Sequence, residues 1–245
     1  MLLDVKDVSI AFGGLKAVQD FSLSIPKGAL YGLIGPNGAG KTTCFNLLTG
    51  VYAPSAGSIK LGGVELIGKR PHQIAACGLS RTFQNIRLFG ELSVVDNVRL
   101  ACHVRGSHSL AGTLVRSSGH VGQERAMMER AMELLGTFAL ADRAQEQARN
   151  LPYGDQRRLE IARALATQPE LLLLDEPAAG MNPQEKRQLR ELIRQVRDRF
   201  GLTILLIEHD MGVVMSICEH ITVLDHGCII ARGGAEAIQN DPKVI

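Results

Sequence analysis

The sequence predicts an α/β fold: a core with a mostly parallel sheet, an N-terminal antiparallel β subdomain and an inserted helical subdomain. Three observations predict it. Short unbroken apolar runs are typical of parallel strands that are covered on both faces. Runs that alternate apolar and polar residues are typical of antiparallel strands with one wet face. A long central stretch carries neither strand pattern and has helical periodicity instead.

The alternating pattern lies in the N-terminal part of the chain. Residues 21–25, with the sequence FSLSI, alternate apolar and polar side chains, and residues 58–66 do so around Gly62 and Gly63. A Gly-Gly pair between two alternating runs indicates a two-residue hairpin turn. We therefore expect antiparallel strands in this region.

Three unbroken apolar runs mark the core, at residues 29–35 (ALYGLIG), 171–175 (LLLLD) and 203–207 (TILLI). Between the last two, apolar residues recur at helical spacing, at Leu189, Leu192, Ile193, Val196 and Phe200. A strand, a helix and a second buried strand form a right-handed crossover unit. The sheet of the core is thus expected to be mainly parallel.

The middle of the chain, from about residue 92 to 148, shows no convincing strand. Met128, Met132, Leu135 and Phe138 predict a helix there, and core packing explains its methionines better than a binding stripe does. The Gly, Ser and His residues of 105–122 favour a variable or mobile segment before this helix. We interpret residues 1–245 as one domain, with a core at 1–84 and 157–245 and a helical subdomain at about 85–156.

Composition limits the possible functions. The 27 Lys and Arg residues nearly balance the 25 Asp and Glu residues, so the net charge of +2 disfavours a dedicated nucleic-acid binder. The 5 cysteines are scattered, which argues for a reducing compartment and against disulfides or a zinc site. No signal peptide and no long apolar run is present, so a membrane role is expected to come through a partner.

Residues 35–43, GPNGAGKTT, carry the strongest functional signal. They fit the phosphate-loop pattern through Gly35, Gly40, Lys41 and Thr42, between a buried strand and a helix. In such a loop the backbone N–H groups surround phosphates, the lysine reaches the β- and γ-phosphates, and the hydroxyl faces Mg²⁺. A plain glycine-rich turn would not need to lie between a buried strand and a helix. The core is therefore expected to be a P-loop NTPase.

Two acids follow the run LLLLD directly. Asp175 is placed to hold the magnesium shell, and Glu176 is placed to orient and deprotonate the attacking water. Adjacent acids at a strand end are often only a solvated edge. In a chain that also carries a phosphate loop, a catalytic pair explains them better.

Five further segments accompany the phosphate loop in order: RTFQNIRLF, LPYGDQRRLEIARAL, LLLLDEP, AAGMNP and IEHD. With them the chain resembles the nucleotide-binding subunit of an ATP-binding cassette (ABC) transporter over essentially its whole length. The first two segments and DEPAAGMNP are similar, more narrowly, to the ATPase subunits of branched-chain amino-acid importers. The resemblance implies an ATP-hydrolysing enzyme that uses ATP and Mg²⁺.

The resemblance also implies a role for individual residues. Phe12 would stack on adenine with Val18 nearby, although Phe12 could instead be a buried strand aromatic. Glu176, His209 and Gln84 would be catalytic, although a lone His is often structural. Magnesium would be held by Thr42, Gln84 and Asp175. The phosphates would be held by Gly35, Pro36, Asn37, Gly38, Ala39, Gly40, Lys41, Thr42 and Thr43.

A second subunit is implied to complete each site, so that two ATP molecules lie between two ATPase subunits. Leu151, Tyr153 and Gly154 would face the partner's nucleotide, and so would Asn182, which stands where many relatives have aspartate. Pro152 replaces the signature serine and is expected in the first turn of a helix. The neighbouring Asp155 is expected to turn away from phosphate.

The implied partners are a second ATPase subunit, identical or paralogous, two transmembrane permease subunits, and indirectly an extracytoplasmic solute-binding protein. The chain would then lie at the cytoplasmic face of the cell membrane. The permease contact is expected near Asn85, Leu88 and Phe89, although Leu88 and Phe89 could equally be core residues of the helical subdomain.

Other functions remain open at this stage. An ABC transporter could handle urea, amides or lipopolysaccharide, and a cassette ATPase could act as a switch without transport. Cassette switches usually carry two cassettes or long coiled coils, whereas this chain has one phosphate loop and no sustained heptads. A nucleotide-binding module without turnover would not need Glu176.

Overall fold

The computed structural model describes residues 1–105 and 118–244, and the side chains outside 105–121. Two compact units make up the chain: residues 1–84 with 170–245, and residues 85–169. The second unit therefore takes in the whole helix at 153–166, whereas the sequence interpretation placed residues from 157 onward in the core. Residues 106–117 of the expected variable segment lie outside the described part.

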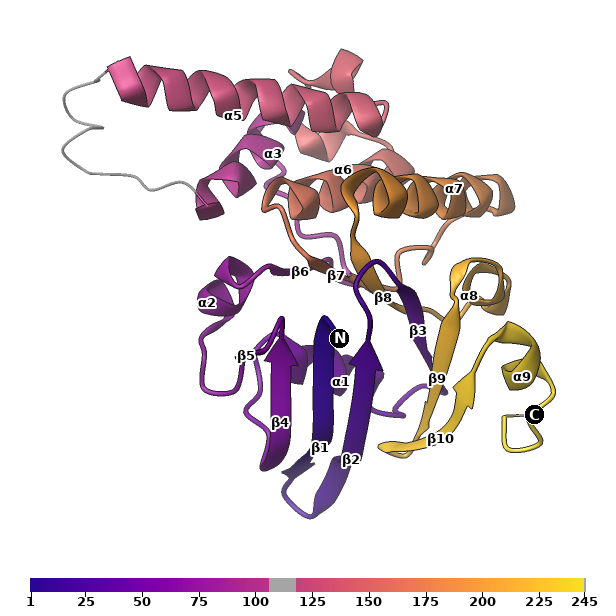
Figure 1. The fold of residues 1–245 in the computed structure, drawn as a ribbon. Coiled ribbons are helices and arrows are strands. Elements are labelled where there is room, and N and C mark those ends of the chain that lie inside the picture. Colours follow the sequence, from indigo (N-terminus) through magenta and orange to yellow (C-terminus); the bar gives the residue numbers. More distant parts are fainter. Residues whose placement is uncertain (106–117, 245) are drawn as a thin grey trace. The chain divides into compact units, whose positions relative to one another are not determined.

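The first unit contains a four-stranded antiparallel sheet of β1 (Leu3–Phe12), β2 (Leu15–Ile25), β4 (Ala56–Leu61) and β5 (Val64–Glu65). Its strand order is β2-β1-β4-β5 (Figure 1). The predicted hairpin is present, since Leu61 pairs with Val64 across Gly62 and Gly63. The antiparallel N-terminal subdomain is thus confirmed.

A six-stranded sheet forms the rest of the first unit's framework. Its strands are β3 (Leu30–Ile34), β6 (Leu79–Arg81), β7 (Leu171–Asp175), β8 (Thr203–Ile207), β9 (His220–Asp225) and β10 (Cys228–Gly233). The order is β10-β9-β3-β8-β7-β6, with only β10 antiparallel to its neighbour. The apolar runs at 29–35, 171–175 and 203–207 form β3, β7 and β8 respectively, and every residue of β7 and β8 is buried.

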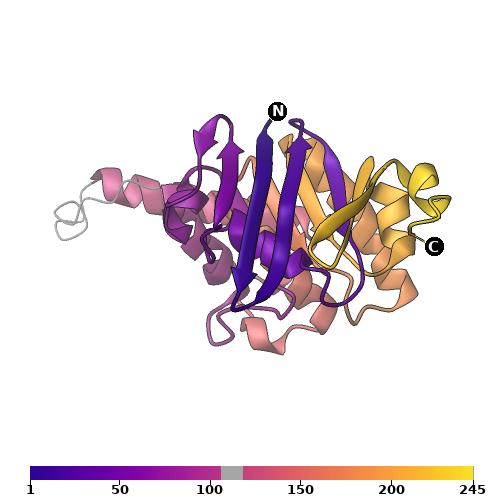
Figure 2. The same ribbon diagram turned by 90° about the horizontal axis from the view of Figure 1, so that it is seen from below.

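The first unit also contains helices. They are α1 (Lys41–Leu48), α2 (Pro71–Ala76), α7 (Pro183–Phe200), α8 (Met211–Ile217) and α9 (Ala235–Gln239). The α1 helix buries Cys44, Phe45 and Leu48 in an apolar cluster that draws on both sheets. The α7 helix buries Leu189, Ile193 and Val196, as its periodicity predicted. The short α9 helix packs near β9 and β10 (Figure 2).

This topology brings several loops to one edge of the six-stranded sheet. The chain leaves β3, β7 and β8, which are parallel neighbours, at their carboxyl ends. In open α/β sheets, ligands bind at this edge. The phosphate loop follows β3, and His209 follows β8. Asp175 is the last residue of β7, and Glu176 comes directly after it.

The second unit is helical. It contains α3 (Val94–Cys102), α5 (Ser118–Thr137), α6 (Tyr153–Ala166) and short 3₁₀ turns at His103–Arg105, Ala141–Arg143 and Ala148–Asn150. Leu135 and Phe138 are buried as predicted, whereas Met132 is 37% exposed, so its assignment to the core was wrong. Ala131 and Leu134, on the neighbouring helical positions, fill the core instead. No helix in the described part of the chain has the length and apolarity needed to span a membrane.

Candidate active site

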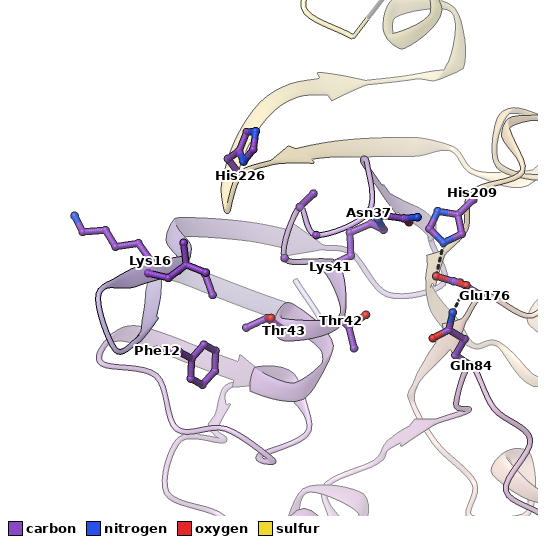
Figure 3. Close-up of a pocket in the computed structure, with 15 residues that line it drawn as sticks. Phe12, Lys16, Asn37, Lys41, Thr42, Thr43, Gln84, Glu176, His209 and His226 are labelled. Atoms are coloured by element: carbon purple, nitrogen blue, oxygen red, sulfur yellow. Dashed lines mark hydrogen bonds and ion pairs between the residues drawn. The ribbon is translucent and has the colours of Figure 1, made fainter.

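A cavity of about 630 Å³ opens in the first unit (Figure 3). The phosphate loop and the start of α1 lie in its middle, the β1–β2 hairpin borders one side, and Gln84, Glu176 and His209 border the other. Its lining comprises Phe12, Leu15, Lys16, Ala17, Asn37, Gly38, Ala39, Gly40, Lys41, Thr42, Thr43, Gln84, Glu176, His209 and His226. Most of the predicted nucleotide-binding residues therefore share one cavity.

Two glycines of the phosphate loop are required by its geometry. Gly35 has φ +147°, and a Cβ on it would lie 1.9 Å from the carbonyl oxygen of Leu224. Gly40 has φ +102°, and its Cβ would lie 2.6 Å from the carbonyl oxygen of Ala17. Both conformations disfavour residues with a side chain. The glycines of the phosphate-loop pattern are thus required because the loop closely approaches β9 and β2.

Lys41 lies folded over its own loop. Its Nζ donates to the carbonyl oxygens of Gly35 at 2.7 Å and Pro36 at 2.8 Å, and the residue is only 5% exposed. Burial lowers the pKa of Lys41, and the nearby carboxylates of Glu176 and Asp175 oppose this shift. Gly35 and Pro36 were predicted to hold phosphate, but they do not line the cavity. They contact the site through the hydrogen bonds that their carbonyl oxygens accept from Lys41.

The three predicted catalytic residues are in contact. Glu176 accepts a hydrogen bond through Oε2 from Gln84 Nε2 at 2.7 Å, and its Oε1 contacts His209 Nε2. The carboxylate is largely buried, and Glu176 itself has φ +48°, in the left-handed region. His209 lies two residues beyond β8, which ends at Ile207.

The predicted metal ligands offer oxygen donors. Asp175 is 2% exposed, and its Oδ2 accepts from Arg81 Nη2 at 2.7 Å. Its Oδ1 is buried and has no hydrogen-bond partner among the residues that the structure describes. Thr42 and Gln84 line the cavity. Within the described residues, no group of three or more His, Cys, Asp or Glu could hold a metal by itself. The set suits Mg²⁺, because this ion prefers oxygen ligands and is usually bound by one or two protein carboxylates together with oxygens of the substrate phosphates.

The other end of the cavity carries the aromatic residue. Phe12 is 46% exposed, so the alternative of a buried strand aromatic is wrong, and its ring meets Tyr52 edge to face with centroids 5.1 Å apart. Val18 is 1% exposed and belongs to the core beneath, not to the cavity lining.

Four cavity residues were not predicted from the sequence, namely Leu15, Lys16, Ala17 and His226. Lys16 follows Phe12 in the same hairpin, which is a usable sequence signal, whereas His226 comes from the distant β9–β10 turn and has none.

Comparison with known proteins decides the family. The family model described as ABC transporter matches residues 18–179. The chain belongs to the ABC transporter family. Curated members of the family include the high-affinity branched-chain amino acid transport ATP-binding proteins LivG of Escherichia coli (strain K12) and BraF of Pseudomonas aeruginosa. They are 47% and 45% identical to this chain, and each match covers 100% of it and 96% of the relative.

A solved member of the ABC transporter family, an ATP-binding cassette in its ADP conformation, has a TM-score of 0.86. It is 30% identical, and the match covers 99% of this chain and 96% of that one. A nucleotide-free ATP-binding cassette gives the same TM-score at 31% identity. The predicted fold class and the assignment to ABC ATPases, which bind and hydrolyse ATP, are confirmed.

The signature segment of this ABC ATPase lies in the second unit. Leu151 is buried, Tyr153 is exposed and Gly154 is half-buried at the start of α6. Pro152 is the N-cap residue, with ψ 152°, and not part of the first turn as expected; it makes no side-chain capping bond.

Asp155, in the first turn of α6, lies near two cations. Its carboxylate oxygens are 3.4 Å from Arg143 Nη1 and 3.7 Å from Arg158 Nη1.

Asn182 caps helix α7. Its Oδ1 accepts from the backbone N–H groups of Gln184 at 2.9 Å and Glu185 at 3.0 Å, and the Glu185 side chain accepts from Asn182 N–H at 2.8 Å. This reciprocal capping box satisfies orphan amides of the first turn. The asparagine therefore has a structural task within its own chain.

Proposed function

We propose that this chain is the ATP-hydrolysing subunit of an importer for branched-chain amino acids. The contact of Glu176 with both Gln84 and His209, next to the phosphate loop, is the observation that supports hydrolysis. The full-length similarity to LivG and BraF, whose names specify branched-chain amino acid transport, supports the solute.

Phe12 and the phosphate loop would hold the nucleotide. Adenine stacks on the exposed ring of Phe12, and the loop amides with the N-terminus of α1 receive the phosphates. Lys41 exchanges the carbonyls of Gly35 and Pro36 for phosphate oxygens. Mg²⁺ bound by Thr42, Gln84 and the unpaired Oδ1 of Asp175 would neutralise phosphate charge.

Glu176 acts as the general base. A water placed against its carboxylate gives up a proton to Oε as the water oxygen attacks the γ-phosphate. Gln84 and His209 hold the two oxygens of this carboxylate and fix its direction. The strained backbone of Glu176 persists because the surrounding contacts hold it.

A second ATPase subunit, identical or paralogous, completes each site. Leu151, Tyr153 and Gly154 of one subunit face the nucleotide of the other, and the amides at the start of α6 attract its γ-phosphate. Because the Asn182 oxygen already caps α7, we expect its side chain to reach across the dimer as a hydrogen-bond donor. Hydrolysis removes the γ-phosphate contacts and lets the dimer open.

Two transmembrane permease subunits receive this motion at the cytoplasmic face of the membrane, and an extracytoplasmic binding protein delivers the solute. We place their contact near Asn85, Leu88 and Phe89. Phe89 is 54% exposed and carries the Arg163 guanidinium 5.6 Å from its ring centroid, which supports docking rather than a core role for it. No nucleic-acid partner is proposed, in keeping with the net charge of +2.

The Glu176→Gln variant tests the proposed hydrolysis. Because the amide cannot accept the proton of the attacking water, we expect ATP hydrolysis to be lost while ATP-dependent dimers accumulate. Phosphate release and size-exclusion chromatography with ATP measure the two effects. Glu170→Gln, which removes a 51% exposed carboxylate 3.8 Å from Lys27, is the matched control and should hydrolyse at the unmodified rate. Steady turnover by Glu176→Gln would show that another group is the base.

A further inference from the structure

Arg81 is a nearly buried cation beside the proposed metal site. It ends β6, three residues before Gln84, and its side chain is 6% exposed. The guanidinium donates from Nη2 to Asp175 Oδ2 and from Nη1 to Asn46 Oδ1, each at 2.7 Å. Its central carbon lies 5.4 Å and 5.0 Å from the ring centroids of Phe45 and Phe83.

This fork joins two elements that carry proposed magnesium ligands. Asn46 lies in α1, one helical turn after Thr42, and Asp175 ends β7. The guanidinium is planar and presents its donors in a rigid geometry, so it fixes the spacing of the two oxygens that it contacts. The guanidinium contacts Oδ2 of Asp175, and Oδ1 has no hydrogen-bond partner in the described part of the chain.

We propose that Arg81 is the positioning residue of the metal side of the site. It holds the free oxygen of Asp175 and the hydroxyl of Thr42 at the spacing that Mg²⁺ with ATP requires. This inference rests on the proposed function.

A role in stability alone explains the arrangement less well. A buried ion pair stabilises a fold little compared with apolar residues of the same volume, because both charges lose their hydration. A methionine at position 81 would fill the same space between Phe45 and Phe83. The two-armed contact and the unpaired Oδ1 instead have the features of an outer-shell group that orients a metal ligand.

The test compares ATP affinity with EDTA and with Mg²⁺ in Arg81→Met, measured by titration calorimetry. Outer-shell partners of metal ligands change metal affinity by about 10-fold or more when removed. We therefore expect the gain in ATP affinity from Mg²⁺ to fall by about that factor. Affinity in EDTA should stay within about twofold, because the phosphate loop is untouched.

Two further variants grade the effect and remain informative if Arg81→Met does not fold. Arg81→Lys keeps the charge but reaches one acceptor, so it should restore only part of the Mg²⁺ gain. Asn46→Ala removes the α1 arm alone and should lose a smaller part. Arg197→Met is the matched control: it removes an arginine of α7 from its 2.6 Å pair with Glu219 and should keep the full gain.

Each opposite result overturns the inference. An equal loss of affinity in EDTA and in Mg²⁺ would show a purely structural role, and an unchanged gain would show no role. A larger gain in Arg81→Met would show that Arg81 competes with the metal. If the unmodified protein binds ATP without any help from Mg²⁺ and does not hydrolyse it, the proposed function fails instead.

Discussion

Glu176 illustrates how a single residue carries backbone strain for chemistry. Its φ of +48° lies where non-glycine residues are uncommon, and such a conformation costs on the order of 1 to 3 kcal/mol. Its side-chain contacts with Gln84 and His209 come from segments far away in the sequence. The carboxylate thereby points into the cavity at the end of β7.

The cysteines allow a test of burial at single residues. Burial raises the pKa of Cys44 and of Cys218 to about 12. At about pH 8 fewer than roughly one in 1,000 of these thiols is ionised, and the thiolate is the reactive form. We expect iodoacetamide to label the half-buried Cys77 and Cys228 before Cys44 and Cys218, as followed by peptide mass spectrometry.

Unfolding in urea provides the control for this experiment, because all 5 cysteines should then be labelled at similar rates. Labelling of native Cys44 as fast as Cys77 would contradict the packing of α1 between the two sheets.

At the scale of elements, the start of α6 differs from a common ABC signature. Pro152 fills the N-cap without a side-chain bond, and Gln156 Nε2 instead donates to the carbonyl oxygen of Leu151 at 2.8 Å. Serine at an N-cap accepts a bond from a helix amide and can face a phosphate, an interaction worth about 1 kcal/mol or more.

We therefore expect Pro152→Ser to tighten ATP-driven dimerisation, which sedimentation in the Glu176→Gln background can measure. Pro152→Ala removes the ring without adding a hydroxyl and should dimerise like the unmodified chain. Equal dimerisation of the serine and alanine variants would show that the hydroxyl is irrelevant here.

Helix α7 shows a local signal that sequence reasoning overlooked. The order Asn182, Pro183, Gln184, Glu185 places a capping residue, a proline at the first helical position and a glutamate at the third. This is a capping box, and it could be read from the sequence without any resemblance. The capping box gives Asn182 a structural role at the start of its own helix.

At the scale of the molecule, prediction succeeded where the signal was local. The strands β3, β7 and β8 and the phosphate loop follow from short apolar runs and fixed glycine spacing. The links between Arg81 and Asp175 and between Gln84 and Glu176 span 94 and 92 residues, and no spacing rule encodes them. His226 likewise enters the cavity because the turn between β9 and β10 lies beside it in the fold, and no local sequence signal indicates this.

Transport is a property of the whole assembly, so its test uses membrane vesicles. With the permease subunits and binding protein present, we expect ATP-driven uptake of labelled leucine only when this chain is added. The Glu176→Gln chain is the matched control and should support none. Uptake of urea or amides in place of leucine would keep the ATPase assignment and replace the solute.

The contacts of Lys41 have a consequence for the conformation of the phosphate loop. The amine donates to the carbonyl oxygens of Gly35 and Pro36, so the end of the loop is tied to its first two residues. The curvature of the loop is therefore held by one of its own side chains as well as by the backbone freedom of its glycines. Under the proposed function, a substitution of Lys41 would then change both the shape of the loop and its affinity for phosphate.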